Sequence, residues 1–170
     1  MDLQSTIRPI PDFPKPGILF RDITTLLQNP DALNAAIAGM TYHCQTLGAE
    51  VIVGVESRGF LFGPAIAQQL GLGFVPVRKP GKLPAPTYQV SYALEYGTDT
   101  LEIHQDAFQP GMKAVIVDDL IATGGTAAAT AQLIEQAGAT LAGYSFLIEL
   151  VDLGGRSQLP DVPVESLISY

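Results

Sequence analysis

Two adjacent carboxylates stand beside a loop of small residues within residues 115–126. A β-branched run at 115–117 predicts a strand, and Asp118 and Asp119 follow it directly. The loop that comes next consists of Ala122, Thr123, Gly124, Gly125 and Thr126, and a helical pattern begins at residue 127. Backbone N–H groups and Thr hydroxyls at a helix N-terminus favour an anion, and glycines let the backbone approach it closely. This order predicts a site for a ribose 5-phosphate, whose sugar hydroxyls would donate hydrogen bonds to the two carboxylates.

The same stretch also has plainer interpretations. A Gly-Gly pair occurs in ordinary turns, and paired aspartates occur at solvated strand ends. A Walker A loop is excluded because the chain contains no Gly-Lys-Ser/Thr, and no dinucleotide-binding glycine fingerprint follows a strand. The ordered combination of strand, carboxylates, loop and helix favours the phosphate site over an ordinary turn.

Cationic residues gather at two further places. Arg58 follows a predicted strand at 51–55, where its planar guanidinium can bind a diphosphate beside backbone N–H groups. Arg78, Lys79 and Lys82 supply three of the chain's nine Lys and Arg residues. Because the net charge is −8, a polyphosphate site needs such a local cluster or a metal ion. The alternatives are a strand-end arginine and a loop tip that both lie in solvent.

The elements that must position these residues alternate between strand and helix. Apolar patterning predicts strands at 51–55, 74–77, 114–118, about 140–150 and 162–168, and helices at 30–47, 60–70 and 127–137. Asn29 is the expected N-cap of the first helix. The alternation predicts an α/β fold, with a single domain over residues 1–170 and a central, mostly parallel sheet flanked by helices. Ligands bind at the carboxyl ends of such strands, where residues 56–58 and the two carboxylates fall.

Two segments depart from this pattern. Residues 1–22 are Pro-rich and extended rather than helical. Residues 78–104 join the cation cluster to several prolines and a hairpin of about 88–96 and 100–104. A long irregular segment inside a compact domain is usually functional or disordered. We therefore expect 78–104 to form a flexible lid of low local stability.

Composition limits the partners of the chain. Its acidic balance argues against a nucleic-acid or anionic-membrane surface, and no apolar run reaches the length that spans a bilayer. Cys44 is the single cysteine, so we expect no internal disulfide and a reducing compartment. The start of the chain lacks the pattern of a secretion signal. These features predict a protein of a reducing compartment that binds neither nucleic acid nor membrane.

Residues 115–126 resemble the signature with which the type I phosphoribosyltransferases bind phosphoribosyl diphosphate (PRPP). Three further segments, 11–22, 56–60 and 91–97, resemble the adenine-specific branch of that family, and the resemblance runs from about Ile10 to the C-terminus. It implies transfer of the 5-phosphoribosyl group from PRPP to adenine, giving AMP and pyrophosphate in purine salvage. It also implies Mg²⁺ bound with PRPP, with Asp118 as the nearest candidate ligand, and a cytoplasmic homodimer.

The resemblance assigns roles to individual residues. Contacts to the ribose and phosphate of PRPP are implied for Asp118, Asp119, Ala122, Thr123, Gly124, Gly125 and Thr126. Contacts to pyrophosphate are implied for Ser57, Arg58, Arg78, Lys79, Lys82, Tyr96 and His104. Contacts to adenine are implied for Leu19, Phe20 and Arg21, within an N-terminal hood of residues 1–28.

The resemblance implies that Glu95 is the proton-transfer group and faces the imidazole edge of the purine. General acid–base chemistry needs such a carboxyl within hydrogen-bond reach of the purine. The resemblance also implies a cis peptide between Glu56 and Ser57. Plainer interpretations remain for three of the assigned residues. Glu95 could be an exposed side chain, Phe20 a core residue and His104 a surface strand residue.

Two other functions stay open at the level of sequence. The first is a phosphoribosyltransferase for another base, such as xanthine, hypoxanthine or orotate, and segments 11–22 and 91–97 argue against it. The second is a non-catalytic regulator that senses PRPP, since some transcription regulators use this fold. Such a regulator needs a nucleic-acid-binding element, and the acidic sequence carries no basic helix.

Overall fold

The computed structural model describes residues 2–94 and 96–170, so the candidate proton-transfer residue Glu95 lies outside the described residues. The chain divides into two compact units, Met1–Gly39 and Met40–Tyr170. The helix α2 (Pro30–Thr46) begins in the first unit and ends in the second.

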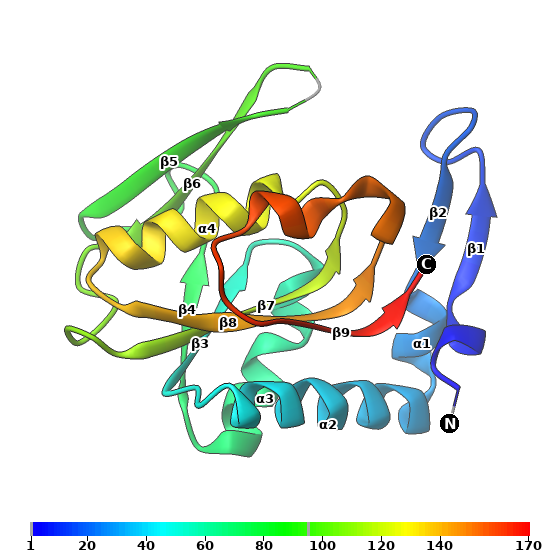
Figure 1. The fold of residues 1–170 in the computed structure, drawn as a ribbon, viewed down its shortest axis with the longest axis horizontal. Helices are drawn as coiled ribbons and strands as arrows, with labels where there is room; N and C mark the ends of the chain where they lie inside the picture. The colour runs from blue at the N-terminus through cyan, green and yellow to red at the C-terminus, as the bar shows by residue number, and fades with distance from the viewer. Residues whose placement is uncertain (1, 95) are drawn as a thin grey trace. The chain divides into compact units, whose positions relative to one another are not determined.

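The first unit contains a two-stranded antiparallel ribbon, formed by β1 (Arg8–Pro11) and β2 (Leu19–Asp22) (Figure 1). The short helices η1 (Gln4–Thr6) and α1 (Thr24–Gln28) flank it. The Pro-rich arm is extended, as predicted, in β1 and β2. It turns between the two strands and forms the short helix η1 before them. Asn29 Oδ1 accepts hydrogen bonds from the N–H groups of Asp31 and Ala32, at 3.1 and 3.2 Å, which confirms it as the cap of α2.

The second unit is built on a five-stranded, all-parallel sheet with the order β4-β3-β7-β8-β9. The strands are β3 (Val51–Val55), β4 (Gly73–Val77), β7 (Lys113–Ile121), β8 (Thr140–Glu149) and β9 (Val164–Ser169). Helices α3 (Gly63–Leu70) and α4 (Gly125–Gln136) lie on opposite faces of the sheet (Figure 1). The α/β class and the parallel sheet predicted from the sequence are confirmed.

The strand β7 is longer than the sequence predicts. It was expected to end at Asp118, but it stays paired with β8 as far as Ile121, which lies opposite Glu149. Asp118 and Asp119 therefore lie within a strand, and both are buried. Buried carboxylates need partners from neighbouring elements, so this correction bears directly on the chemistry of the site.

The expected helix at 60–70 is interrupted. The 3-10 helix η2 (Arg58–Leu61) comes first, and α3 begins only at Gly63. A Cβ on Gly63 would lie 2.4 Å from the Phe74 ring, so glycine lets this turn approach β4. Beyond β8 the chain forms two further short helices, η3 (Val151–Leu153) and η4 (Gly155–Gln158), which the sequence patterns did not predict.

The hairpin of the expected lid is anchored in the core. It consists of β5 (Thr87–Ala93) and β6 (Thr98–His104). Val90, Leu101 and Ile103 are buried in the same apolar cluster as the sheet. Backbone hydrogen bonds of 2.8 and 3.0 Å also join Arg78 to Glu102 at the base of the hairpin. The low local stability expected of residues 78–104 stays a prediction. The described packing adds that alternating apolar side chains of the hairpin enter the core.

Two smaller expectations concern the rest of the chain. Cys44 is buried and unpaired, so no disulfide involves it. Within residues 2–94 and 96–170, no helix combines the length and the apolar character that crossing a membrane requires.

Candidate functional site

The two buried carboxylates of β7 lie beside the loop that follows β3. Because β3 and β7 are neighbouring parallel strands, the loop after β3 comes beside Asp118 and Asp119. Ser57 Oγ donates to Asp118 Oδ1 at 3.1 Å, and Arg58 Nε lies 2.7 Å from Asp119 Oδ2. The two segments singled out in the sequence as carboxylate and diphosphate sites are therefore in direct contact.

Burial dominates the electrostatics of the carboxylate pair. It raises the pKa of Asp118, and the neighbouring charge of Asp119 raises it further. Burial also raises the pKa of Asp119, although the Arg58 guanidinium partly offsets this. The pair therefore resists carrying two full negative charges. A ligand that donates sugar hydroxyls or brings a cation would stabilise the ionised form.

Gly59 permits the close approach of η2 to β7. A Cβ at this position would lie 2.6 Å from Asp118 Oδ1 and 3.1 Å from the Val117 carbonyl. The first contact is shorter than a real Cβ makes, so a side chain at residue 59 would force η2 or Asp118 to move and would disturb the contact of Ser57 with Asp118. The Gly59 N–H in turn donates to Ser57 Oγ at 3.2 Å.

The loop of residues 122–126 leads into the N-terminus of α4. Gly124 has a φ of +88° and caps the helix without a side-chain hydrogen bond, which leaves the amides of the first turn to an external acceptor. The loop is supported from behind by η4. A Cβ on Gly124 would lie 2.5 Å from the Gly155 carbonyl, and one on Gly155 would lie 2.4 Å from the Ala122 carbonyl. Sequence reasoning missed Gly155, and its only signal was a Gly-Gly pair soon after a long strand.

A cavity of about 820 Å³ opens at this end of the sheet. Ten of the residues assigned from the sequence line it: Ser57, Arg58, Lys79, Asp118, Asp119, Ala122, Thr123, Gly124, Gly125 and Thr126. Tyr92 and Asp99 of the hairpin also line it, and neither was singled out from the sequence. The Tyr92 hydroxyl lies 3.0 Å from Thr126 Oγ1, so the hairpin and the phosphate loop are joined across the cavity.

The cations of the expected lid are held by carboxylates at the edge of this cavity. Glu56 accepts from Arg78 Nη2 at 3.3 Å, from the Lys79 N–H at 2.8 Å and from the Lys82 ammonium. The Lys79 ammonium is paired with Asp99. Burial raises the pKa of Glu56, but the hydrogen bonds from the lid outweigh it and lower the pKa to about 2. The carboxylate is therefore ionised throughout the physiological range.

Some expected pyrophosphate residues lie elsewhere. Tyr96 is exposed beside the start of β6, and His104 Nε2 accepts a hydrogen bond of 3.3 Å from the Ala85 N–H. Neither belongs to the described residues that line the cavity. Arg78 and Lys82 are not among those residues either, but both contact Glu56, which is. The Glu56–Ser57 peptide is trans, so the expected cis bond is not found. In the trans form Ser57 caps η2, as its contact with Gly59 shows.

The expected adenine residues all lie in β2 of the first unit. Phe20 is half-buried and packs edge-on against Phe13, with 5.1 Å between ring centroids. Leu19 and Arg21 lie opposite Pro11 and Pro9 in β1. Proline has no N–H and is favoured where the backbone points out of a strand pair. This arrangement favours an outward direction for the backbone groups of Leu19 and Arg21 as well.

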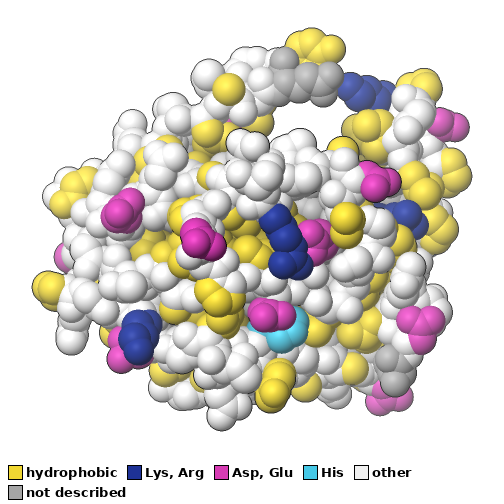
Figure 2. All heavy atoms as spheres, viewed as in Figure 1, with side chains coloured by type: hydrophobic (Ala, Val, Ile, Leu, Met, Phe, Trp, Pro, Cys, Tyr) yellow, Lys and Arg dark blue, Asp and Glu magenta, His cyan; other side chains and the backbone are white. Residues whose placement is uncertain are grey.

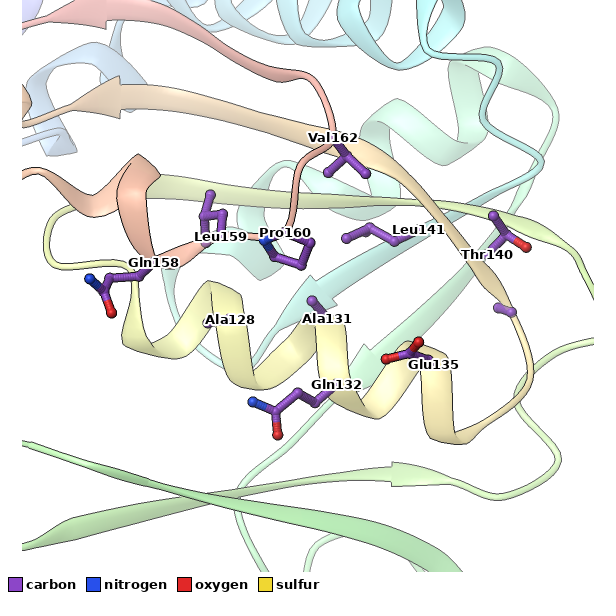
Figure 3. A pocket seen from close by; sticks show the side chains of 11 residues that line it. Ala128, Ala131, Gln132, Glu135, Thr140, Leu141, Gln158, Leu159, Pro160 and Val162 are labelled. Atoms are coloured by element: carbon purple, nitrogen blue, oxygen red, sulfur yellow. The ribbon is translucent and has the colours of Figure 1, made fainter.

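A second cavity, of about 460 Å³, lies between α4 and the chain leading to β9. Ala131, Leu141, Leu159, Pro160 and Val162 gather around it (Figure 3). None of the residues assigned from the sequence is among those lining it. Its largely apolar walls give it no chemistry of the kind found around Asp118.

Comparisons with known proteins agree with this geometry. Residues 22–161 match the model of the phosphoribosyl transferase domain. The adenine phosphoribosyltransferase of Synechococcus sp. is 62% identical over 170 residues, which cover 100% of this chain and 99% of that relative. The crystal structure of the adenine phosphoribosyltransferase of Thermoanaerobacter pseudethanolicus superimposes with a TM-score of 0.95 at 50% identity, covering 99% of this chain and 98% of that one.

The yeast enzyme extends the comparison to a ligand complex. The adenine phosphoribosyltransferase of Saccharomyces cerevisiae, in complex with an imino-altritol bisphosphate and adenine, gives a TM-score of 0.93 at 45% identity, covering 97% of this chain and 96% of that one. Full-length identity and the shared fold lead to one assignment. The chain belongs to the phosphoribosyltransferase family, in the branch formed by the adenine phosphoribosyltransferases.

Proposed function

We propose that the chain transfers the 5-phosphoribosyl group of PRPP to adenine, giving AMP and pyrophosphate. The observation that carries this function is the meeting of a buried carboxylate pair, a diphosphate-type arginine and an anion-binding helix N-terminus in one cavity. The family relationship supplies the substrates, since full-length relatives are adenine phosphoribosyltransferases.

The ribose 5-phosphate half of PRPP binds at the start of α4. The amides of residues 122–126 and the hydroxyls of Thr123 and Thr126 hold the 5-phosphate. Asp118 and Asp119 accept hydrogen bonds from the ribose hydroxyls. These contacts hold the ribose in place and orient C1′ for attack by the N9 atom of adenine. Orientation of the reacting groups supplies a large part of the rate enhancement of enzymes.

The leaving pyrophosphate is held by Ser57 and Arg58 on one side and by Arg78, Lys79 and Lys82 on the other. Negative charge grows on the pyrophosphate as the bond to C1′ breaks, so cations directed at it stabilise the transition state. Closure of the lid also excludes water from the electron-poor C1′ centre. Tyr96 and His104 join this group only if the hairpin changes position, since they lie outside the cavity lining.

Mg²⁺ enters as part of the PRPP substrate. Asp118 and Asp119 would contribute hard carboxylate oxygens to it, and Asp119 Oδ2 is buried beside the Arg58 guanidinium, with Nε 2.7 Å away. One or two carboxylates together with substrate oxygens make the kind of environment that Mg²⁺ prefers. When bound, the ion neutralises charge on the diphosphate.

Adenine is bound by β2. The Phe20 ring stacks on the purine, and the outward backbone groups of Leu19 and Arg21 read its edge. A 6-oxo purine reverses the donor and acceptor at that edge and would leave buried groups unpaired, which a binding site rejects strongly. Glu95 handles the proton of the purine imidazole, a role that rests on the family resemblance.

The competing functions have less support. A regulator that senses PRPP needs a nucleic-acid-binding element. On the face seen in Figure 2 the Lys and Arg side chains are few and lie apart, and the net charge is −8. A preference for another purine or for orotate conflicts with the relatives. The chain matches adenine phosphoribosyltransferases over their whole length.

The proposal includes a homodimer in the cytoplasm. The dimer follows from the family resemblance. The buried, unpaired Cys44 agrees with a reducing compartment.

The deciding experiment is AMP formation by the purified chain from adenine, PRPP and Mg²⁺. Hypoxanthine, guanine, xanthine and orotate are tested in parallel, with the matching nucleotide as the product. We expect adenine to be used far faster than any other base. Comparable turnover of a 6-oxo purine would disprove the role of β2, and no turnover of any base would favour the regulator.

A further inference from the structure

Glu56 occupies an unusual position for an acidic residue. It lines the cavity that takes a polyanion, at the carboxyl end of β3. Its side chain is only 18% exposed, and both carboxylate oxygens accept hydrogen bonds from residues 78–82 at the start of the lid. One oxygen accepts from Arg78 and Lys82, and the other accepts from the Lys79 N–H.

This arrangement resembles the binding of a phosphate by the same donors. A guanidinium, an ammonium and a backbone amide converge on two oxygens of one anion, which is the pattern that proteins use for phosphate groups. A fixed negative charge at this place would otherwise oppose the binding of pyrophosphate. Its presence calls for a role that an exposed surface acid would not have.

We propose that Glu56 is a positioning residue that stands in for pyrophosphate, holding Arg78, the Lys79 amide and Lys82 together until the diphosphate takes them over. The inference rests on the proposed function, in which these lid groups contact pyrophosphate. Pyrophosphate then replaces the Glu56 carboxylate as the acceptor of these donors. Because the donors already lie together, their side chains need little further ordering when pyrophosphate binds. Competition from Glu56 also weakens the hold on pyrophosphate and helps the product leave.

The test is the substitution Glu56→Gln, which keeps the shape of the side chain and removes its charge. Binding of magnesium pyrophosphate to the unliganded protein is measured by calorimetry, and PRPP kinetics are measured separately. We expect the Kd for pyrophosphate to fall by about threefold to tenfold, the scale on which partly exposed ion pairs act. The KM for PRPP should fall as well, and kcat should fall because the product leaves more slowly.

A matched control removes the same charge from a nearby carboxylate. Glu102 lies at the base of the hairpin, where its backbone pairs with that of Arg78. Within residues 2–94 and 96–170, its side chain accepts only from the neutral donors Gln89 Nε2, at 2.8 Å, and the Gly81 N–H, at 3.3 Å. Glu102→Gln should leave the Kd for pyrophosphate unchanged. An equal gain in both variants would mean that net charge, rather than release of the lid cations, causes the effect, and would overturn the proposal.

A double substitution identifies the cations involved. In the Lys82→Gln background, Glu56→Gln should gain less pyrophosphate affinity than in the wild-type background, because one of the released cations is gone. Glu56→Ala provides a second variant if Glu56→Gln folds poorly, and melting temperatures report on folding for both. An equal gain with and without Lys82 would contradict a role for its ammonium.

Weaker or unchanged pyrophosphate binding in Glu56→Gln overturns the stand-in role. Weaker binding would mean that Glu56 aims the cations at the product. This failure is distinguishable from failure of the proposed function, because wild-type AMP formation is measured independently. If the wild type forms AMP but Glu56→Gln shows no gain, only the inference about Glu56 is lost.

Discussion

The hydroxyl of Tyr92 lies 3.0 Å from Oγ1 of Thr126, which joins the hairpin near its turn to the first turn of α4. The Tyr92 ring also packs on Gly125, where an added Cβ would lie 3.3 Å from Cδ2. The same hydroxyl lies 3.4 Å from Asp99 Oδ2, and Asp99 pairs with Lys79. A continuous chain of contacts thus leads from the phosphate loop to a lid cation.

Tyr92→Phe should raise the KM for PRPP by roughly threefold to tenfold with little change in kcat, the effect expected from loss of one hydrogen bond that orients a binding group. The phenyl ring retains the packing on Gly125, so the melting temperature should change little. Steady-state kinetics with varied PRPP provide the measurement. Tyr42→Phe, at an exposed position of α2, is the control, and an equal change there would exclude a specific role for Tyr92.

Asp118→Asn should separate stability from activity. Because burial raises the folded-state pKa of Asp118 above its ordinary value of 3.8, the folded chain holds a proton that the unfolded chain releases. The resulting loss of stability is absent below pH 3.8 and grows as the pH rises towards the folded-state pKa. Removing the carboxylate should therefore raise the melting temperature at pH 8, by about 2–4 °C for each kcal/mol gained in the free energy of unfolding. The increase should be smaller at pH 5.

The activity of Asp118→Asn should fall at the same time, because the amide no longer offers an anionic acceptor to the ribose hydroxyls. Thermal unfolding across pH and AMP formation are the two measurements. Asp106→Asn, at an exposed position, should alter neither. A lower melting temperature of Asp118→Asn at pH 8 would show that the buried carboxylate stabilises the fold instead.

Gly59→Ala should strongly reduce activity. The new Cβ would lie 2.6 Å from Asp118 Oδ1, so either η2 or the carboxylate must move. Overpacking of this kind costs about 1–3 kcal/mol in stability and would displace Ser57 and Arg58 from the carboxylates. Chemical denaturation and PRPP kinetics test both effects. Gly73→Ala is the matched control, since a Cβ there meets nothing within 4 Å, and similar losses in both variants would contradict the steric argument.

Phe20→Ala should raise the KM for adenine while leaving the KM for PRPP nearly unchanged. Stacking on an aromatic ring contributes in the ground state, at about 1–3 kcal/mol per base in other base-binding proteins. Phe13→Ala removes the partner ring, which lies 5.1 Å away, and should give a smaller increase. An unaltered adenine KM accompanied by a lower melting temperature would identify Phe20 as a structural residue.

Local patterns in the sequence were sufficient for the sheet and for much of the site. The all-apolar run of β3 was predicted with its observed bounds, and the order of motifs brought Ser57 and Arg58 to the carboxylates. The end of β7 was misjudged because pairing of Leu120 and Ile121 with β8 depends on a distant strand. The packing of the hairpin on the core was not predicted for the same reason, since burial of Leu101 depends on the sheet below it.

Contacts between segments far apart in the chain were beyond the reach of sequence patterns. The support of the phosphate loop by Gly155 depends on distances of 2.4 and 2.5 Å that no local motif encodes. The ion pairs of Glu56 likewise join residues more than twenty positions apart. Such residues look like ordinary loop positions until the fold brings them together.

The mutual packing of Gly124 and Gly155 has a consequence for protein engineering. Each glycine leaves room for a carbonyl of the other segment, so neither segment can accept a larger residue while the other stays in place. A transplant of residues 122–126 into another scaffold should fail unless residues 154–158 travel with them. Random libraries that vary the two segments independently should yield few functional clones, whereas libraries that exchange them as a pair between homologues should retain far more.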